Sequence, residues 1–142
     1  MKKIIFVCTG NTCRSPMAMF LFNKISKERN LDYIADSAGL AAYGDPINPN
    51  SAKALAKIGI NNTDYTSKAL TYYMVDEADL IVAMESVHKN ALLNAGVDAN
   101  KILVLAGGIS DPYGGDEEVY FSCLEKISGG IEEMLKGDAF ND

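Results

Sequence analysis

The chain has 142 residues, of which 48% are apolar and 23% are charged, close to the average for soluble globular proteins. Its formal charge of −6 repels a phosphate backbone and argues against nucleic-acid binding. No apolar run approaches the ~18 residues of a transmembrane helix, so we expect a soluble protein without a membrane partner. The length fits one domain, residues 1–142.

Strand-like and helix-like stretches alternate along the chain. β-branched and apolar runs predict strands at 3–7, 33–38, 80–83 and 102–105. Apolar residues at spacings of three and four, with Pro or Gly at the boundaries, predict helices at 16–30, 50–58, through Val87 and Leu92 to just before Gly96, and at 117–135. A Gly-, Pro- and Asn-rich loop is expected at 39–49.

This alternation indicates an α/β fold built from right-handed βαβ units. We predict a four-stranded parallel sheet with helices on both faces. Ligands of such open sheets bind at the carboxyl ends of the strands. The loops after Val7, Ala38, Ala83 and Leu105 are therefore where we expect the chemistry.

The loop after the first strand reads Cys-Thr-Gly-Asn-Thr-Cys-Arg-Ser-Pro from Cys8 to Pro16. Gly10 and Asn11 tolerate a left-handed backbone, which lets successive N–H groups curl inward and bind an anion. The helix that follows adds its positive end, and Arg14 adds a planar guanidinium that can hold two phosphate oxygens. The loop lacks the GxxxxGK[ST] pattern of nucleotide-binding loops.

Cys8 lies where these influences meet. A helix N-terminus and a guanidinium lower the pKa of a thiol from about 8.5 into the ~3.5–7.5 range, so we expect a thiolate nucleophile. The alternative is a small buried residue at a strand end, which the surrounding Gly-Asn and Arg-Ser-Pro disfavour. Asp111, after the fourth strand, is a candidate general acid and base, although an Asp-Pro pair can also be an ordinary turn.

These residues resemble a known family. The stretch from Val7 to Pro16, together with Asp111-Pro112-Tyr113, is similar to the low-molecular-weight protein-tyrosine-phosphatase family, whose pattern is a Cys-x5-Arg-Ser loop and a distant Asp-Pro. The likeness extends over nearly the full chain, including segments 36–39 and 77–80. It implies the family's α/β fold, a three-layer sandwich whose four-stranded parallel sheet has the order 2-1-3-4. It implies a phosphorylated protein or peptide substrate and inorganic phosphate as product.

The resemblance also implies roles. In such enzymes the residue matching Cys8 takes the phosphoryl group, that matching Arg14 binds it, and that matching Asp111 protonates the leaving group. Residues matching Asn11, Ser15 and Ser37 hold the loop in shape by hydrogen bonds. The expected phosphate-binding residues are Thr9, Gly10, Asn11, Thr12, Cys13, Arg14 and Ser15.

The substrate stays open between phosphotyrosine and phosphoarginine. Thr12 resembles the protein-arginine-phosphatase branch, because members that act on phosphotyrosine commonly carry an aliphatic residue there. Tyr43 and Tyr113 fall where aromatic walls flank a phenyl ring, but aromatic faces also attract a guanidinium. Thr12 could equally face solvent, and Tyr43 could be loop packing.

The chain departs from the family at one position and leaves others undecided. Family members often place a histidine behind the loop, where this chain has Tyr65. His88, the single histidine, is expected on an exposed helix in a structural or solvated role. Cys13 could form a protective disulfide with Cys8 or could fill the helix start, and Cys123 is expected to be core or surface filler.

No cofactor or metal is expected, because phosphoryl transfer through cysteine needs none and the acidic run 116–118 is typical of a helix N-terminus. The three cysteines lack zinc-site spacing and the density of a disulfide scaffold, which favours a reducing cytoplasm. No interface can be read from the sequence, and we expect a monomer.

Three other functions compete with the phosphatase. A thiol-dependent arsenate reductase shares the fold and loop but needs two further cysteines after the third strand, and residues 80–100 contain none. A cysteine phosphocarrier would keep its phosphate, whereas Arg14 and Asp111 promote hydrolysis. A silent phosphopeptide-binding module would not need nucleophile, clamp and acid together.

Overall fold

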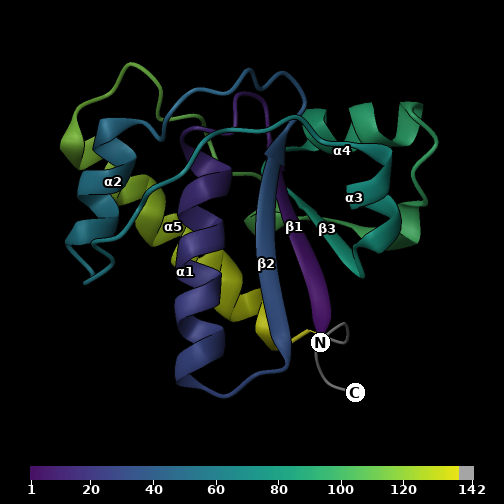
Figure 1. Ribbon diagram of the computed structural model, residues 1–142, viewed down its shortest axis with the longest axis horizontal. Coiled ribbons are helices and arrows are strands. Elements are labelled where there is room, and N and C mark those ends of the chain that lie inside the picture. The colour runs from purple at the N-terminus through teal and green to yellow at the C-terminus, as the bar shows by residue number, and fades with distance from the viewer. Residues whose placement is uncertain (138–142) are drawn as a thin grey trace.

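The structure is a computed structural model, which describes residues 1–137; residues 138–142, the end of the predicted domain, lie outside the described residues. Strands and helices alternate along the chain (Figure 1). The strands are β1 (Lys2–Cys8), β2 (Tyr33–Gly39), β3 (Leu80–Ala83) and β4 (Ile102–Val104). The α-helices are α1 (Arg14–Glu28), α2 (Pro49–Ala56), α3 (Tyr72–Glu77), α4 (Ser86–Asn94) and α5 (Glu117–Leu135), and two short 3₁₀ turns flank β4, at η1 (Ala99–Lys101) and η2 (Leu105–Gly107).

The four strands form one parallel sheet of order β2-β1-β3-β4, which confirms the predicted topology. β1 lies in the middle, where Ile4 pairs with Ala35 on one side and with Leu80 on the other. Its continuous run of buried residues is typical of a parallel strand covered on both faces.

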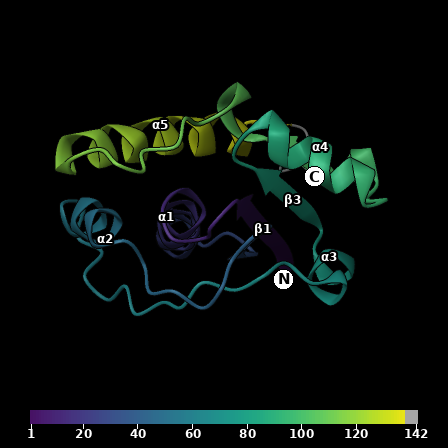
Figure 2. The ribbon, with the colours of Figure 1, turned by 90° about the horizontal axis from the view of Figure 1, so that it is seen from above.

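Successive side chains of β1 point to opposite faces and build two cores. Ile4 and Phe6 belong to the larger core, which α1, α2 and α5 cover, whereas Ile5 and Val7 belong to a smaller core with Leu92 of α4. Seen from above, α1, α2 and α5 lie on one side of the sheet and α3 and α4 on the other (Figure 2). The three-layer arrangement predicted from the sequence is thus present.

Several element ends differ by one or two residues from the sequence prediction, and one helix was missed. α1 begins at Arg14, two residues before Pro16, and β4 ends at Val104 because Ala106 adopts a left-handed φ of 51° inside the 3₁₀ turn η2. The short helix α3 was not predicted. Its six residues are too few to show a helical period, and it is defined by its cap, in which Thr71 Oγ1 accepts from the Met74 N–H at 3.1 Å.

The carboxyl ends of the strands place the candidate site. The loop after β1, residues Met84 and Glu85 after β3, and the segment 109–111 after η2 all lie at this edge, where the Ile109 N–H donates to the Met84 carbonyl at 2.7 Å. Gly39, at the end of β2, lets the chain approach closely, since a Cβ there would lie 2.5 Å from the Thr9 carbonyl oxygen. Within residues 1–137, no helix has the length and apolarity to cross a bilayer.

Candidate active site

The loop after β1 curls its backbone around the Cys8 sulfur. Asn11 has a left-handed φ of 59°, and its N–H donates to Cys8 Sγ at 3.3 Å. This is the nest that the Gly-Asn pair predicts. Cys8 is only 3% exposed, so the loop amides and the start of α1 provide most of its polar surroundings.

Ser15 touches the same sulfur from the first turn of α1. Its Oγ lies 2.8 Å from Cys8 Sγ and accepts a hydrogen bond from Asn11 Nδ2, also at 2.8 Å. Because the oxygen already accepts from Asn11, the Ser15 hydroxyl proton is free to donate to the sulfur. A hydroxyl in this orientation stabilises a thiolate.

Opposing influences act on the Cys8 thiol. Burial raises its pKa above the ordinary value and outweighs the lowering by the Ser15 hydroxyl, the Ser15 and Asn11 amides and the Arg14 guanidinium. The sequence argument for a lowered pKa considered only the helix N-terminus and the Arg14 guanidinium, which lower it. It could not include burial this deep, nor the carboxylates that share the charge of Arg14.

A closed ring of hydrogen bonds supports the loop from behind. Asn11 Nδ2 donates to Ser37 Oγ at 3.0 Å, Ser37 Oγ lies 2.6 Å from Tyr65 Oη, and Tyr65 Oη donates to Asn11 Oδ1 at 2.5 Å. Asn11 Oδ1 also accepts from the Lys68 N–H at 3.0 Å. Asn11 and Ser37 are completely buried. Burial raises the pKa of the Tyr65 phenol, so its hydroxyl keeps its proton and the ring of hydrogen bonds stays closed.

The Tyr65 hydroxyl makes two of the three bonds of the ring. The predicted loop-support residues Asn11, Ser15 and Ser37 are brought together. The phenol adds a bond to both Asn11 and Ser37 without a group that titrates near neutral pH.

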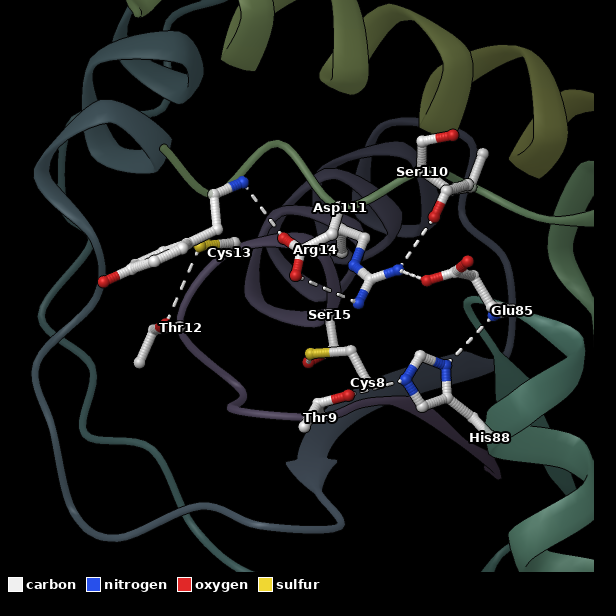
Figure 3. Close-up of polar contacts among 12 residues, drawn as sticks. Cys8, Thr9, Thr12, Cys13, Arg14, Ser15, Glu85, His88, Ser110 and Asp111 are labelled. Atoms are coloured by element: carbon white, nitrogen blue, oxygen red, sulfur yellow. Dashed lines mark hydrogen bonds and ion pairs between the residues drawn. The ribbon is translucent and has the colours of Figure 1, made fainter. Parts of the chain in front are cut away.

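Arg14 is 3% exposed and is held by three oxygens (Figure 3). Its Nη1 donates to the Ile109 carbonyl at 2.8 Å and to the Glu85 carboxylate, and Nη2 lies 3.7 Å from Asp111 Oδ2. These contacts bring the predicted guanidinium clamp and the predicted general acid to the same side of the Cys8 loop. Glu85 was not identified from the sequence.

His88 corrects a sequence expectation. It is 2% exposed and not on a solvated face, because the first turn of α4 packs against the Cys8 loop. Its Nε2 lies 2.9 Å from Thr9 Oγ1, and its Nδ1 accepts from the Glu85 N–H at 3.1 Å. Burial and the nearby Arg14 charge lower the pKa of His88. A helical period of nine residues could not reveal this, since the loop covers His88 from outside the helix.

The two aromatic residues of the predicted substrate pocket are open to solvent, whereas Thr12 is half-buried. Tyr43 and Tyr113 are 85% and 78% exposed, and the Asp111 side chain is 50% exposed. Asp111 Oδ1 accepts from the Tyr113 N–H at 3.0 Å, which fixes the turn of the Asp-Pro-Tyr segment. Thr12 is half-buried, with its Oγ1 3.7 Å from Cys13 Sγ.

All three cysteines are free and buried. Cys13 Sγ lies 3.4 Å from Tyr120 Oη of α5, so the residue packs the start of α1 against that helix. Cys123 belongs to the larger core and its Sγ lies 3.9 Å from the Ser110 carbonyl oxygen, as expected for a filler. Burial raises the pKa of Cys123 to about 11.

Sequence reasoning missed the site roles of Glu85 and His88, although the sequence holds a weak signal for each. Glu85 follows the third predicted strand by two residues, at the edge where chemistry was expected. His88 comes three residues later, the spacing at which a helix returns to its own N-terminus. The acidic run 116–118 is a helix start, as predicted, because Asp116 Oδ1 accepts from the Val119 N–H at 3.1 Å.

Known proteins are similar to this chain in sequence and fold. The family model described as low molecular weight phosphotyrosine protein phosphatase matches residues 3–139. A protein-arginine-phosphatase of Bacillus subtilis is 33% identical over 94% of both chains, and an arsenate reductase of Bacillus cereus is 32% identical over 95% of this chain and 92% of its own. A crystal structure of a low molecular weight protein tyrosine phosphatase from T. tengcongensis has a TM-score of 0.90 and 38% identity, with 96% of this chain and 99% of that chain covered. The chain therefore belongs to the low molecular weight phosphotyrosine protein phosphatase family.

Proposed function

We propose that the protein hydrolyses phosphorylated amino-acid side chains in proteins through a cysteinyl-phosphate intermediate. The observation that carries the proposal is the surroundings of Cys8. Its sulfur accepts from a loop amide and lies beside the Ser15 hydroxyl, while Arg14 and Asp111 meet at the same edge of the sheet. Nucleophile, anion-binding amides, guanidinium and acid are the parts that two-step phosphoryl transfer needs.

Cys8 reacts as a thiolate, because its thiol proton passes to an oxygen of the bound phosphoryl dianion. In the first step the sulfur attacks phosphorus, an S–P bond forms, and the bond from phosphorus to the leaving oxygen or nitrogen breaks. Asp111 gives its proton to that leaving atom. Arg14 and the amides of residues 9–15 stabilise the charge on the three phosphoryl oxygens. In the second step Asp111 takes a proton from water, and the water oxygen attacks phosphorus. The S–P bond then breaks, which restores the Cys8 thiolate and releases inorganic phosphate.

The test is the substitution Cys8→Ser, which keeps the size of the side chain and removes the sulfur. We expect turnover of phosphopeptides to disappear, because a serine alkoxide is a much poorer leaving group than a thiolate and a phosphoserine in this loop would not be hydrolysed. Steady-state release of inorganic phosphate measures the effect. Full activity of the Cys8→Ser protein would refute the assignment.

Two substrates fit the proposal. Similarity to the Bacillus protein-arginine-phosphatase and the hydroxyl of Thr12 favour phosphoarginine. The family description and the exposed rings of Tyr43 and Tyr113 favour phosphotyrosine. The carboxylates of Asp111 and Glu85, on either side of Arg14, provide acceptors that a substrate guanidinium can use and a phenyl ring cannot.

Parallel turnover of matched phosphotyrosine and phosphoarginine peptides separates them, with Thr12→Ile as the variant. We expect Thr12→Ile to lower kcat/KM for phosphoarginine about tenfold or more, because the added methyl bulk crowds the guanidinium, and to leave phosphotyrosine turnover within about twofold. An unchanged ratio between the two peptides would remove Thr12 from the specificity of the enzyme.

Arsenate reduction is the second candidate, supported by the similarity to the Bacillus cereus arsenate reductase. It needs cysteines that relay the disulfide, and the third cysteine, Cys123, is buried on α5 with its thiol at the Ser110 carbonyl. Thiol-dependent formation of arsenite by the purified protein tests this function.

We also propose a cytoplasmic monomer, supported by three free thiols and by a site built from one chain.

A further inference from the structure

Both ends of the Cys8 loop are connected to the start of α4. Thr9, at one end, contacts His88 through its hydroxyl, and Arg14, at the other end, donates to Glu85. Glu85 and His88 are themselves joined, because the Glu85 N–H donates to His88 Nδ1 at 3.1 Å. A continuous chain of contacts therefore runs from Thr9 through His88 and Glu85 to Arg14 (Figure 3).

The contacts of the imidazole fix its tautomer. A backbone N–H can only donate, so Nδ1, which faces the Glu85 N–H, carries no proton. A neutral ring then has its proton on Nε2, where Thr9 Oγ1 lies 2.9 Å away and accepts it. Both ring nitrogens are used, and only the neutral form of His88 satisfies both partners.

The charges around His88 come from three elements. Arg14 faces it from α1, Glu85 from the N-terminus of α4, and Asp111 from the loop after η2. Burial and the Arg14 charge lower its pKa, and the two carboxylates oppose them with smaller effects. The ring is therefore neutral near pH 7. A proton on Nδ1 would place two donors against each other and break the contact with Glu85.

We propose that His88 is a positioning residue of the phosphate-binding loop, whose neutral imidazole ties Thr9 at the start of the loop to Glu85, the carboxylate that holds Arg14 at its end. The inference rests on the proposed function only in that this loop receives a phosphoryl group. Thr9 is exposed, so packing does not fix it, and the bond from His88 does. Glu85 and Ile109 occupy Arg14 Nη1, whereas Nη2 has the longer 3.7 Å contact with Asp111 Oδ2, so the edge formed by Nε and Nη2 is the one that phosphoryl oxygens can reach.

The test is a double-mutant cycle read by the dissociation constant of inorganic phosphate, measured by titration calorimetry at pH 7. Thr9→Val keeps the shape of residue 9 and removes its acceptor oxygen. His88→Asn keeps an oxygen near the Nδ1 position for the Glu85 N–H and no longer reaches Thr9. We expect each single variant to weaken phosphate binding about three- to tenfold, as the loss of one hydrogen bond does.

The double variant should bind phosphate no more weakly than the weaker single variant, because both changes remove the same contact. Val87→Ala is the matched control, since Val87 is a 63% exposed neighbour on α4. Multiplied effects in the double variant, or a Thr9→Val protein that binds phosphate like the wild type, would overturn the proposal. Thr9→Val lies at an exposed position, so this arm is readable even where His88→Asn unfolds.

A second readout does not depend on binding. His88 is the single histidine of the chain, so its ring nitrogens give one assignable set of ¹⁵N signals in an untagged protein. We expect the tautomer with the proton on Nε2, and a titration below the ordinary value of 6.5. The opposite tautomer, or a titration at or above 6.5, contradicts the role assigned to His88.

Turnover measured beside these readouts separates the two proposals. A wild type that binds phosphate but hydrolyses neither phosphopeptide refutes the phosphatase, while the cycle still decides the role of His88. An active phosphatase with independent Thr9 and His88 effects refutes the positioning role alone. A wild type without measurable phosphate binding overturns both.

Discussion

The two loops that meet at the candidate site differ in how firmly the protein holds them. In the Cys8 loop, Asn11 is completely buried, Arg14 is 3% exposed, and the side chains of both bond to neighbouring elements. In the loop that carries Asp111, that side chain is half exposed and Tyr113 is 78% exposed. The side chains of one loop are fixed from behind, whereas the Asp111 side chain is held by its own turn and by the 3.7 Å contact with Arg14.

This difference matches the two tasks that the proposed reaction sets. The phosphoryl group is the same in every substrate, so donors fixed in advance around it lower the barrier without reorganisation. The leaving group belongs to a protein that varies, so the acid benefits from an open position. Preorganisation is thus concentrated in the Cys8 loop, where the chemistry does not change. Substitutions in the Cys8 loop and in the Asp111 loop should therefore have different effects.

The largest effect is expected in the acid loop. Asp111→Asn removes the proton donor and should lower kcat/KM for phosphopeptides, which reports the first step alone, about a hundredfold. An activated ester such as 4-nitrophenyl phosphate, whose leaving group departs without a proton, should lose much less. Steady-state kinetics on both substrates measures the difference, and an equal loss on both would show that Asp111 acts on the loop and not on the leaving group.

A smaller effect is expected behind the Cys8 loop. Tyr65→Phe opens the hydrogen-bonded ring and leaves the buried Ser37 hydroxyl and Asn11 carbonyl with one partner fewer. We expect the free energy of unfolding to fall by about 1–3 kcal/mol and KM for any phosphorylated substrate to rise. Denaturant unfolding and kinetics measure these changes.

Tyr73→Phe is the control for that experiment, because it removes the same hydroxyl from a 71% exposed ring on α3. Equal unfolding free energies for Tyr65→Phe and the wild type would mean that the ring does not support the loop. A loss of stability without any change in KM would separate folding from loop geometry.

The smallest effect concerns Cys123, which lies under the acid loop. In the unfolded chain the pKa of the Cys123 thiol is near 9, whereas in the folded protein it is about 11. Stability from this group is therefore complete below pH 9 and is lost as the pH rises through 11. We expect Cys123→Ala to reduce the loss of unfolding free energy between pH 9 and 11 by about 1–2 kcal/mol.

Chemical denaturation at the two pH values measures that difference. Part of the alkaline loss should persist in the variant, because burial also raises the pKa of Tyr65 and Tyr120. An unchanged loss in the Cys123→Ala protein would show that the thiol is not protected when the protein is folded.

The sequence was sufficient for the sheet and for the residues that share one short segment. Alternating buried strands and amphipathic helices indicate a parallel sheet, and the family resemblance gives its order β2-β1-β3-β4. Cys8, Asn11, Arg14 and Ser15 lie within eight residues, so their local pattern is visible. Glu85 and His88 escaped because their roles arise only when α4 is placed against the loop. An exposed and a covered histidine on a nine-residue helix look alike in sequence.

The deep burial of Cys8 was likewise hidden, since it depends on how three elements converge. Its consequence, a raised pKa, opposed the electrostatic argument made from neighbouring residues alone. The position of Tyr65 in the sequence suggested a role behind the loop. The ring of hydrogen bonds itself could not be predicted, because it joins residues 11, 37 and 65 through their side chains.

Gly39 has a practical consequence for redesign. A methyl group there would collide with the Thr9 carbonyl oxygen, so the second strand and the phosphate loop meet backbone to backbone. Libraries that aim to change substrate preference should therefore leave this seam untouched and vary Tyr43 and Tyr113, whose rings can be exchanged without disturbing anything beneath them.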